Sequence, residues 1–397
     1  MADVSMTRGQ QRIPFWRDIR KIAILLQVIF VILVVALFAF LFNNMLDGLE
    51  RSNLRISSSF LQESAGIAIG EGPDYSSTDT WARALYVGIA NTLRVAVSGI
   101  VLATILGLLV GISRLSNNWL LRNVSYGYVE LIRNVPLLLQ IFFWFALAAT
   151  FPSPQEAINL GGFFVLSNRG VYAAWARQTE TFALWMPWLV AALVVGVLVF
   201  LWRRRTLIRA DRPGAMLPWA LLAAFDVALG GFLVTVVAGG DAPLFLEKPV
   251  QERFNFRGGT ALTAPFFVLL TALVVYTGAF IGEIVRAGIQ AVSKGQREAA
   301  KALGLTDTQA LRLVILPQAL RVIIPPLTNQ YLNLTKNSSL GIAIAYPDLF
   351  FVGGTIINQT GQTVLVFAII MAAYLSLSLL TSLLMNWYNR RIQLVER

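Results

Sequence analysis

Eight long apolar runs constrain this chain of 397 residues more than any other feature of its sequence. A helix needs about 20 mostly apolar residues to cross a bilayer, and so many runs of that length exceed what a soluble core can bury. Only 13% of the residues are charged, against roughly 25% in an ordinary globular chain. We therefore predict an all-α integral membrane protein with about eight transmembrane helices, at residues 22–43, 86–111, 126–150, 183–202, 217–238, 264–285, 321–344 and 364–387.

Lysine and arginine are distributed unevenly between the loops that join these runs. If the N-terminus is cytoplasmic and the helices alternate in direction, the external side holds few basic residues: Arg51, Arg55, Arg83, Arg169, Arg177, Lys248, Arg253 and Arg257. Apart from Arg94 and Lys336, which fall inside predicted helices, all others are cytoplasmic. This bias follows the positive-inside rule, so both termini are predicted to be cytoplasmic. Orientation in membrane lipid explains the net charge of +11 without nucleic acid.

Several kinds of chemistry are excluded by residue type. The chain has no cysteine and no histidine, which excludes disulfides, thiolate chemistry and imidazole metal sites. It also has no phosphate-binding loop of the GxxxxGK[ST] type, so it is not expected to hydrolyse ATP itself. We predict a protein without catalytic residues, metal ligands or a bound cofactor.

One polar stretch between two apolar runs, "GQREAAKALGLTDTQALRLVILPQAL" at 295–320, has strong local signals for two short helices. Capping boxes are predicted at both starts, Ser293 with Gln296 and Thr306 with Gln309. Gly304 is expected to make a left-handed corner between them. Pro317 is expected to disrupt the second helix after about Leu316. The stretch therefore predicts a helical hairpin in the cytoplasm.

The composition of this hairpin indicates a docking surface. Small side chains at Ala299, Ala300 and Ala302 would let a partner approach closely, while charges such as Arg297 and Glu298 would fix orientation at the rim. A solvated amphipathic linker is the plain alternative. A DNA-reading helix-turn-helix is disfavoured, because the second helix is mostly apolar with a single arginine.

The hairpin resembles the EAA signature of ABC importer permeases, and the spacing matches that pattern without gaps. The matching residues are, in order, Glu298-Ala299-Ala300, Gly304 and Ile315-Leu316-Pro317. In that family the signature forms a coupling helix that docks into a groove on a separate ATPase dimer. The resemblance implies that the side chains that couple this chain to the ATPase are Arg297, Glu298, Ala299, Ala300, Gly304, Leu316 and Pro317.

A wider resemblance covers residues 86–388. Five segments are similar to the polar amino acid branch of these permeases, the histidine-permease-like group: "NTLRVAVSGIVLATILGLLVGISRLS", "YVELIRNVPLLLQIFFWF", "GEIVRAGIQAVSKGQREAAKALG", "LTKNSSLGIAI" and "LSNRGVY". The eight-span permeases of general L-amino-acid and glutamate/glutamine/aspartate/asparagine importers are the subgroup it resembles. This implies a type I importer permease of the bacterial inner membrane, with ATP and Mg on the ATPase. Its expected partners are the ATPase dimer, a related permease in a heterodimer and a periplasmic amino-acid-binding protein.

The resemblance also divides the chain. Compact members of this branch have five spans, so residues 1–85 would be a cytoplasmic N-terminus, an added helix and a periplasmic segment. Residues 86–388 would be the permease domain, interrupted by an insertion at 151–262 with two extra helices. Residues 389–397 would be a cytoplasmic tail.

A polar side chain inside an apolar run costs free energy when it is placed in lipid, so such residues are candidates for the solute pathway. Two helical stripes carry them: Asn91 and Arg94, and, in the seventh run, Asn329, Asn333 and Lys336 with Asn337 and Ser338 beside them. The cations could bind the carboxylate of a polar L-amino acid, and the amide carbonyls its ammonium group. Hydrogen bonding between neighbouring helices is the plain alternative.

Two other functions deserve comparison with an ATP-driven permease. An ion-coupled secondary amino acid transporter commonly places acidic or histidine relays at mid-membrane. This chain has no histidine and few acids there, and such a transporter leaves the hairpin unexplained. A membrane scaffold or sensor would not need polar stripes in two helices.

Overall fold

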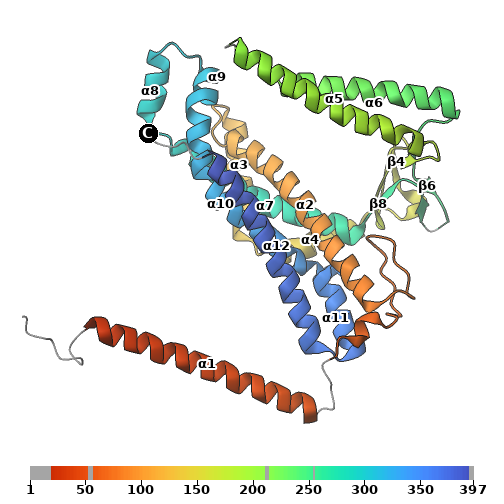
Figure 1. Ribbon diagram of the computed structural model, residues 1–397, viewed down its shortest axis with the longest axis vertical. Coiled ribbons are helices and arrows are strands. Elements are labelled where there is room, and N and C mark those ends of the chain that lie inside the picture. The colour runs from red at the N-terminus through yellow and green to blue at the C-terminus, as the bar shows by residue number, and fades with distance from the viewer. Residues whose placement is uncertain (1–18, 52–56, 211–213, 254, 393–397) are drawn as a thin grey trace, which may run out of the picture.

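The computed structural model describes residues 19–51, 57–210, 214–253 and 255–392, and most of them are helical (Figure 1). The predicted termini at 1–18 and 393–397 lie outside the described residues. The helices are α1 (Ile19–Arg51), α2 (Trp81–Ser113), α3 (Trp119–Asn134), α4 (Leu137–Ala149), α5 (Phe182–Arg209), α6 (Leu217–Gly239), α7 (Ala264–Gln290), α8 (Lys294–Ala302), α9 (Asp307–Ala310), α10 (Leu316–Asn337), α11 (Leu349–Thr360) and α12 (Thr363–Ile392).

Seven helical segments of the described chain are long and apolar enough to cross a membrane, and the number is eight if a bent pair is counted as one span. That pair, α3 and α4, replaces the single helix predicted at 126–150 and is bent by 108°. Val135 at the bend is extended, at φ −106° and ψ 128°, because the Pro136 ring excludes the residue before it from helical angles. Gln140 Nε2 donates to two carbonyls left free there, at 2.9 and 3.0 Å.

The centre of the bundle is the close contact of α2 with α7. Each helix presents two glycines four residues apart, Gly107 and Gly111 on α2 and Gly278 and Gly282 on α7. A Cβ on Gly111 would lie 2.7 Å from the Gly282 carbonyl oxygen, and one on Gly282 would lie 2.9 Å from Val110 Cγ1. Such small faces let two backbones pack at van der Waals distance in a membrane.

A second packed region joins α2 to the C-terminal helices. Leu349, Val352 and Ile356 of α11 are buried with Phe60 and Trp81, against α12. With 12 residues, α11 spans about 18 Å at 1.5 Å per residue, too little to cross a bilayer. The sequence did not predict this helix. Asp348 begins it by accepting hydrogen bonds from Phe351 N at 2.8 Å and from the Tyr374 hydroxyl at 3.0 Å.

The 151–262 insertion adds short strands that the sequence pattern did not predict. They are β1 (Ile158–Leu160), β2 (Phe164–Ser167), β3 (Gly170–Ala173), β4 (Trp175–Gln178), β5 (Leu244–Glu247), β6 (Val250–Gln251), β7 (Phe256–Arg257) and β8 (Thr260–Thr263). One antiparallel sheet has the order β1-β2-β3-β8, and β4–β5 and β6–β7 form two-stranded ladders. Because β8 leads directly into α7, this sheet is fixed to the central helix pair.

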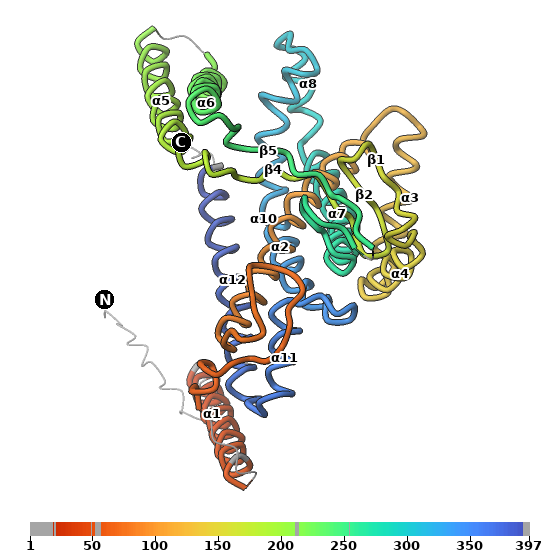
Figure 2. The backbone as a smooth tube through the Cα atoms, turned by 90° about the vertical axis from the view of Figure 1, so that its right-hand side faces the viewer, coloured from red at the N-terminus to blue at the C-terminus, as the bar shows by residue number. Residues whose placement is uncertain are grey.

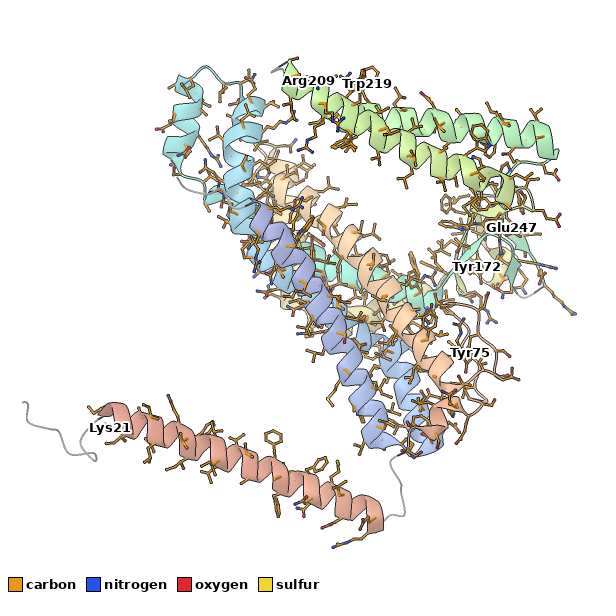
Figure 3. All side chains as sticks on the ribbon, in the orientation of Figure 1. Lys21, Tyr75, Tyr172, Arg209, Trp219 and Glu247 are labelled. Atoms are coloured by element: carbon orange, nitrogen blue, oxygen red, sulfur yellow. The ribbon has the colours of Figure 1, made fainter. Side chains whose placement is uncertain are left out.

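The molecule has two opposite regions (Figures 1 and 3). We call the end with α8, α9 and the C-terminus of α5 at Arg209 the hairpin end. We call the end with the strands and residues 57–80, marked by Tyr75, Tyr172 and Glu247, the strand end. Helices α2, α5, α7 and α12 run toward the hairpin end, and α6, α10 and the α3–α4 pair return from it. Helix α1 lies apart from the bundle in both views, and none of its apolar window is buried (Figure 2).

Candidate functional site

The hairpin has the predicted corner. Helix α8 ends in a Schellman motif, in which Gly304 N donates to the Lys301 carbonyl at 2.9 Å and Leu305 N to the Ala300 carbonyl at 3.2 Å. Gly304 has φ +76°, and a Cβ placed on it would have no neighbouring atom within 4 Å. Backbone conformation alone therefore favours glycine at this corner.

The two predicted capping boxes have different outcomes. At Thr306 both bonds of the box form: Gln309 N donates to Thr306 Oγ1 at 3.4 Å, and Thr306 N donates to Gln309 Oε1 at 2.9 Å. Ser293 is the N-cap of α8, but its hydroxyl makes no capping bond, so this box was predicted wrongly. The Gln296 side chain instead accepts a hydrogen bond from Gln318 Nε2 at 3.3 Å.

Pro317 does not end the second helix, contrary to the prediction. Residues Leu311–Ile315 form a π-helical turn between α9 and α10, in which Leu316 N donates to the Leu311 carbonyl five residues back. The wider turn leaves room for a proline ring and for its missing donor. As a result, one continuous helical path runs from Asp307 to Asn337.

Burial separates the predicted coupling residues. Ala300 is 2% exposed and lies on α8, which packs against α9 and the π-helical turn within the hairpin. It is therefore an internal contact of this chain. The exposed members are Arg297, Glu298, Ala299, Gly304 and Leu316, while Pro317 is partly buried. For these residues the contact with an ATPase remains a prediction.

Sequence reasoning missed Leu303, which lies at the hairpin corner with 80% of its surface exposed. An apolar side chain in the middle of a charged corner is typical of an anchor that a partner covers. The signal was present in the sequence, since Leu303 directly precedes the corner glycine. Beside it, a cavity of about 430 Å³ separates the two arms, lined by Lys294, Arg297, Glu298, Lys301, Asp307, Ala310, Leu311 and Ile315.

Polar contacts attach the hairpin to the end of α7. Arg297 Nη2 donates to the Ile289 carbonyl at 3.0 Å. Six residues before Ile289 on the same helix, Glu283 pairs with Arg286 of α7 and with Arg114 at the end of α2. Arg114 also lies over the Tyr126 ring at 5.3 Å. These contacts connect α2, α3 and α7 just where the hairpin begins.

The predicted stripe on α10 is on the surface of this chain. Asn329, Asn333 and Lys336 are exposed, and their side chains make no hydrogen bond or ion pair with the described residues. Leu334 and Thr335 occupy the buried face of the same turn. Asn337 is partly buried and Ser338 is fully buried, donating to the Thr335 carbonyl at 2.8 Å. The first three side chains remain free to meet solute or a second subunit.

The predicted stripe on α2 has a different environment. Asn91 is fully buried, and its Nδ2 donates to the Pro347 carbonyl at 2.9 Å and to the Glu71 carbonyl at 3.1 Å. Arg94 pairs with the Glu71 carboxylate at 2.9 Å. No hydrogen bond or ion pair between the described residues joins this stripe to Asn329, Asn333 or Lys336. Asn91 thus connects α2 to the loops that carry Glu71 and Pro347, and both Asn91 and Arg94 line a cavity at the strand end. A place in the solute pathway stays a prediction for both residues.

Similar proteins support a transport role. Residues 99–394 match the family described as binding-protein-dependent transport system inner membrane component. The chain is 45% identical over 378 residues to the general L-amino acid transport system permease protein AapQ of Rhizobium johnstonii, covering 94% of this chain and 93% of that one. It is 44% identical to the putative amino-acid ABC transporter permease protein YhdX of Escherichia coli, with 94% of each chain covered. It is 40% identical to the glutamate/glutamine/aspartate/asparagine transport system permease protein BztB of Rhodobacter capsulatus, with 96% of each chain covered.

Proposed function

Because the chain belongs to the binding-protein-dependent inner membrane components, the ABC importer permeases, we propose that it moves polar L-amino acids across the inner membrane by alternating access. The names of AapQ, YhdX and BztB, which it matches over nearly their whole lengths, support this solute class. Its own chemistry is transport, and the ATP and Mg belong to a separate ATPase dimer. Family membership favours this function over an ion-coupled secondary transporter.

The observation that carries the mechanism is the continuous helical path from Asp307 to Asn337. It begins in the exposed hairpin and ends at the polar stripe of Asn333 and Lys336. A rigid helix transmits displacement along its axis, so movement of the hairpin by the closing ATPase dimer would move this stripe as well. The π turn at Leu311–Ile315 supplies the point where the path can adjust.

The hairpin has a second connection, to α7. The bond from Arg297 to the Ile289 carbonyl holds the start of α8 against the end of α7, and α7 packs on α2 through the glycine faces. Motion of α8 would therefore reach α10 and the α2–α7 pair together. Helices that move as packed bodies between two arrangements are the usual basis of alternating access.

The partners follow from the two ends. The ATPase dimer would dock on the hairpin end, with Leu303 and Glu298 on its surface. A periplasmic amino-acid-binding protein would deliver solute at the strand end. A related permease in a heterodimer would complete the pathway by facing Asn329, Asn333 and Lys336, which this chain leaves uncovered. Both termini are then cytoplasmic, and 86–388 with its 151–262 insertion acts as the permease domain.

The docking surface is tested with Leu303→Glu. We expect this variant to reach the membrane normally but to co-purify with little ATPase and to lose ATP-dependent uptake, because a charge replaces the exposed apolar anchor. The matched control is Val250→Glu at the strand end, where the side chain is 65% exposed, and it should retain the ATPase. Wild-type amounts of ATPase on the Leu303 variant would refute the assignment of this surface.

Energy coupling is tested in proteoliposomes that contain the whole importer and its binding protein. Uptake of labelled L-amino acids should require ATP and the binding protein, and it should persist after ionophores collapse ion gradients. Uptake that stops with the gradients would instead support the secondary transporter. Competition by a panel of amino acids would identify which of them the importer carries.

A further inference from the structure

Residues 57–80 form a loop with a firm base. Ala65 N donates to the Asp79 carbonyl at 2.8 Å, Gly66 N to the Ser77 carbonyl at 2.9 Å, and Trp81 N to the Glu63 carbonyl at 3.1 Å. Ala65 and Trp81 are buried against α11 and α12. The loop is thereby fixed where it leaves the bundle, while its far part reaches across the strand end toward β8.

That far part carries a carboxylate between two glycines, Gly70-Glu71-Gly72. Gly72 has φ +110°, and a Cβ there would clash with the Asn91 side chain. The turn is therefore packed directly on α2. This conformation directs Glu71 into the bundle, where its side chain is only 5% exposed.

Glu71 makes three contacts with two elements of the permease core. One carboxylate oxygen accepts from Arg94 Nη1 at 2.9 Å, and the other accepts from the Thr263 hydroxyl at the start of α7. Its backbone carbonyl accepts from Asn91 Nδ2 at 3.1 Å. A cation and a hydroxyl thus bind the carboxylate, and an amide holds the backbone beside it. A guanidinium with a neighbouring hydroxyl is a donor set that binds a carboxylate ligand.

Arg94 is open to solvent on its other side. Its side chain is 34% exposed, and its guanidinium lies 4.2 Å from the centre of the Phe266 ring. It lines a cavity of about 740 Å³ together with Asn91, Trp175, Leu262 and the Gly70–Pro73 turn. That volume is within the range of small-molecule sites. A solute in the cavity could therefore reach the same guanidinium that Glu71 holds.

The ion pair between Arg94 and Glu71 is of a kind in which another carboxylate can replace Glu71. Burial raises the pKa of the Glu71 carboxyl above its ordinary value, although the Thr263 hydroxyl and Arg94 act to lower it. Desolvation thus outweighs what the Thr263 hydroxyl and Arg94 contribute, as happens in many buried ion pairs. A free carboxylate that brings its own contacts can compete for Arg94 under these conditions.

We propose that the cavity at the strand end is a binding site for the carboxylate of the solute, that Arg94 is its cation, and that Glu71 occupies this position as an internal competitor until solute displaces it. This inference rests on the proposed transport of amino acids. It adds a named carboxylate that controls access to the site, and it gives residues 57–80 the role of a lid on the cavity.

The first test is binding of radiolabelled L-glutamate to the purified permease–ATPase complex, measured by equilibrium dialysis without the binding protein. Glu71→Gln should bind L-glutamate roughly fivefold more tightly. Without the Glu71 carboxylate, a larger fraction of the protein has Arg94 available for the ligand. Glu63→Gln, which removes an exposed carboxylate from the same loop, should bind as wild type. Equal dissociation constants for the Glu71 variant and the wild type would overturn the proposal.

The second test separates a ligand role from a structural ion pair. In the doubly exchanged variant Arg94→Glu/Glu71→Arg the pair is restored with opposite polarity, so assembly should be preserved. L-glutamate binding should nevertheless be lost, because the cation now sits on the loop. If this variant binds L-glutamate as the wild type does, the pair is structural and the proposal fails.

The third test leaves Glu71 in place. The chain has no cysteine, and nothing lies within 4 Å of a Cβ placed on Gly70, so Gly70→Cys gives a single reporter on the lid. Its reaction with an anionic, membrane-impermeant methanethiosulfonate should accelerate when L-glutamate is added. An unchanged rate contradicts the proposal even if the Glu71 variants do not assemble. If the wild-type importer shows no ATP-dependent uptake, it is the proposed transport function that fails.

Discussion

Two pairs of membrane helices in this protein, α2 with α7 and α5 with α6, have similar packing but different surroundings. Both use glycine contacts: Gly111 faces the Gly282 carbonyl in the first pair, and Gly196 and Gly231 face Ala224 and Trp188 in the second. In the first pair 33% and 50% of the apolar windows are buried, against 11% and 17% in the second. The first pair is enclosed by α3, α4, α10 and α11, whereas the second packs chiefly on itself.

The difference shows that close helix packing and membership of the core are separate properties. Small residues bring any two membrane helices together, since lipid offers no hydrophobic force to do so. The α2–α7 pair is connected to the hairpin through the bond from Arg297 to the Ile289 carbonyl, and to the Glu71 loop at the strand end through Arg94 and Thr263. The α5–α6 pair joins the strand end through β4 and β5, which flank it in the chain. We therefore expect damage to the first pair to affect the whole protein and damage to the second to stay local.

The largest effect is expected for Gly111→Leu. The new side chain would meet the Gly282 backbone, which cannot move aside without separating α2 from α7, so we expect roughly 3 kcal/mol or more of destabilisation. The measurement is recovery of folded, monodisperse protein after detergent extraction. Gly127→Leu on α3, where a Cβ meets nothing within 4 Å, is the control and should be recovered normally. Normal recovery of the Gly111 variant would show that the two pairs are equally tolerant.

A smaller effect is expected from removal of the second pair. Gln178 of β4 pairs with Leu244 of β5 in an antiparallel ladder, so residues 179–243 can be replaced by a two-residue Asn-Gly turn that closes a hairpin. We expect the remaining protein to insert and to bind the ATPase, with its denaturation midpoint changed by no more than about 2 °C, because separate packed regions contribute nearly independently. Loss of ATPase binding would mean that α5 and α6 belong to the core after all.

The smallest effect concerns the hairpin, which also stands outside the core and depends on local bonds. Thr306→Ala removes the hydroxyl that accepts from Gln309 N and donates to Gln309 Oε1, and it should destabilise the hairpin by about 1 kcal/mol. Ser293→Ala should cost much less, since that hydroxyl makes no capping bond. Amide hydrogen exchange in residues 294–310 would report both changes. Equal protection in the two variants would show that caps do not stabilise this region.

Much of the site could be predicted from nearby residues. The corner at Gly304 and the box at Thr306 depend on contacts within five residues, and both formed as expected. The capping box at Ser293 did not, because Gln296 found a partner 22 residues away in Gln318. The prediction that the second helix ends at Pro317 was wrong for a related reason. The π-helical turn before Pro317 accommodates the proline, and a prediction based on regular α-helix could not include that turn.

The cavity at the strand end was beyond local reasoning. Arg94 was recognised from the sequence as a polar residue in an apolar helix, and its place in the solute pathway stays a prediction. Its partner Glu71 lies in a loop with no periodic pattern. The short strands were missed as well, because they lie in an insertion where turns of glycine and asparagine separate segments of only two to four residues.

By itself, the sequence determined that this chain crosses a membrane about eight times, and it predicts which way the chain crosses and where an ATPase would act on it. These properties depend on the length of apolar runs, on the distribution of charge between loops and on local capping. Each of these can be recognised from the sequence without knowing the tertiary contacts. Only the tertiary structure decided which helices form the core, which backbone carbonyls Asn91 binds, and that Glu71 pairs with Arg94. Those facts depend on contacts between residues far apart in sequence, where the closeness of two backbones or the burial of a charge is settled by the fold as a whole.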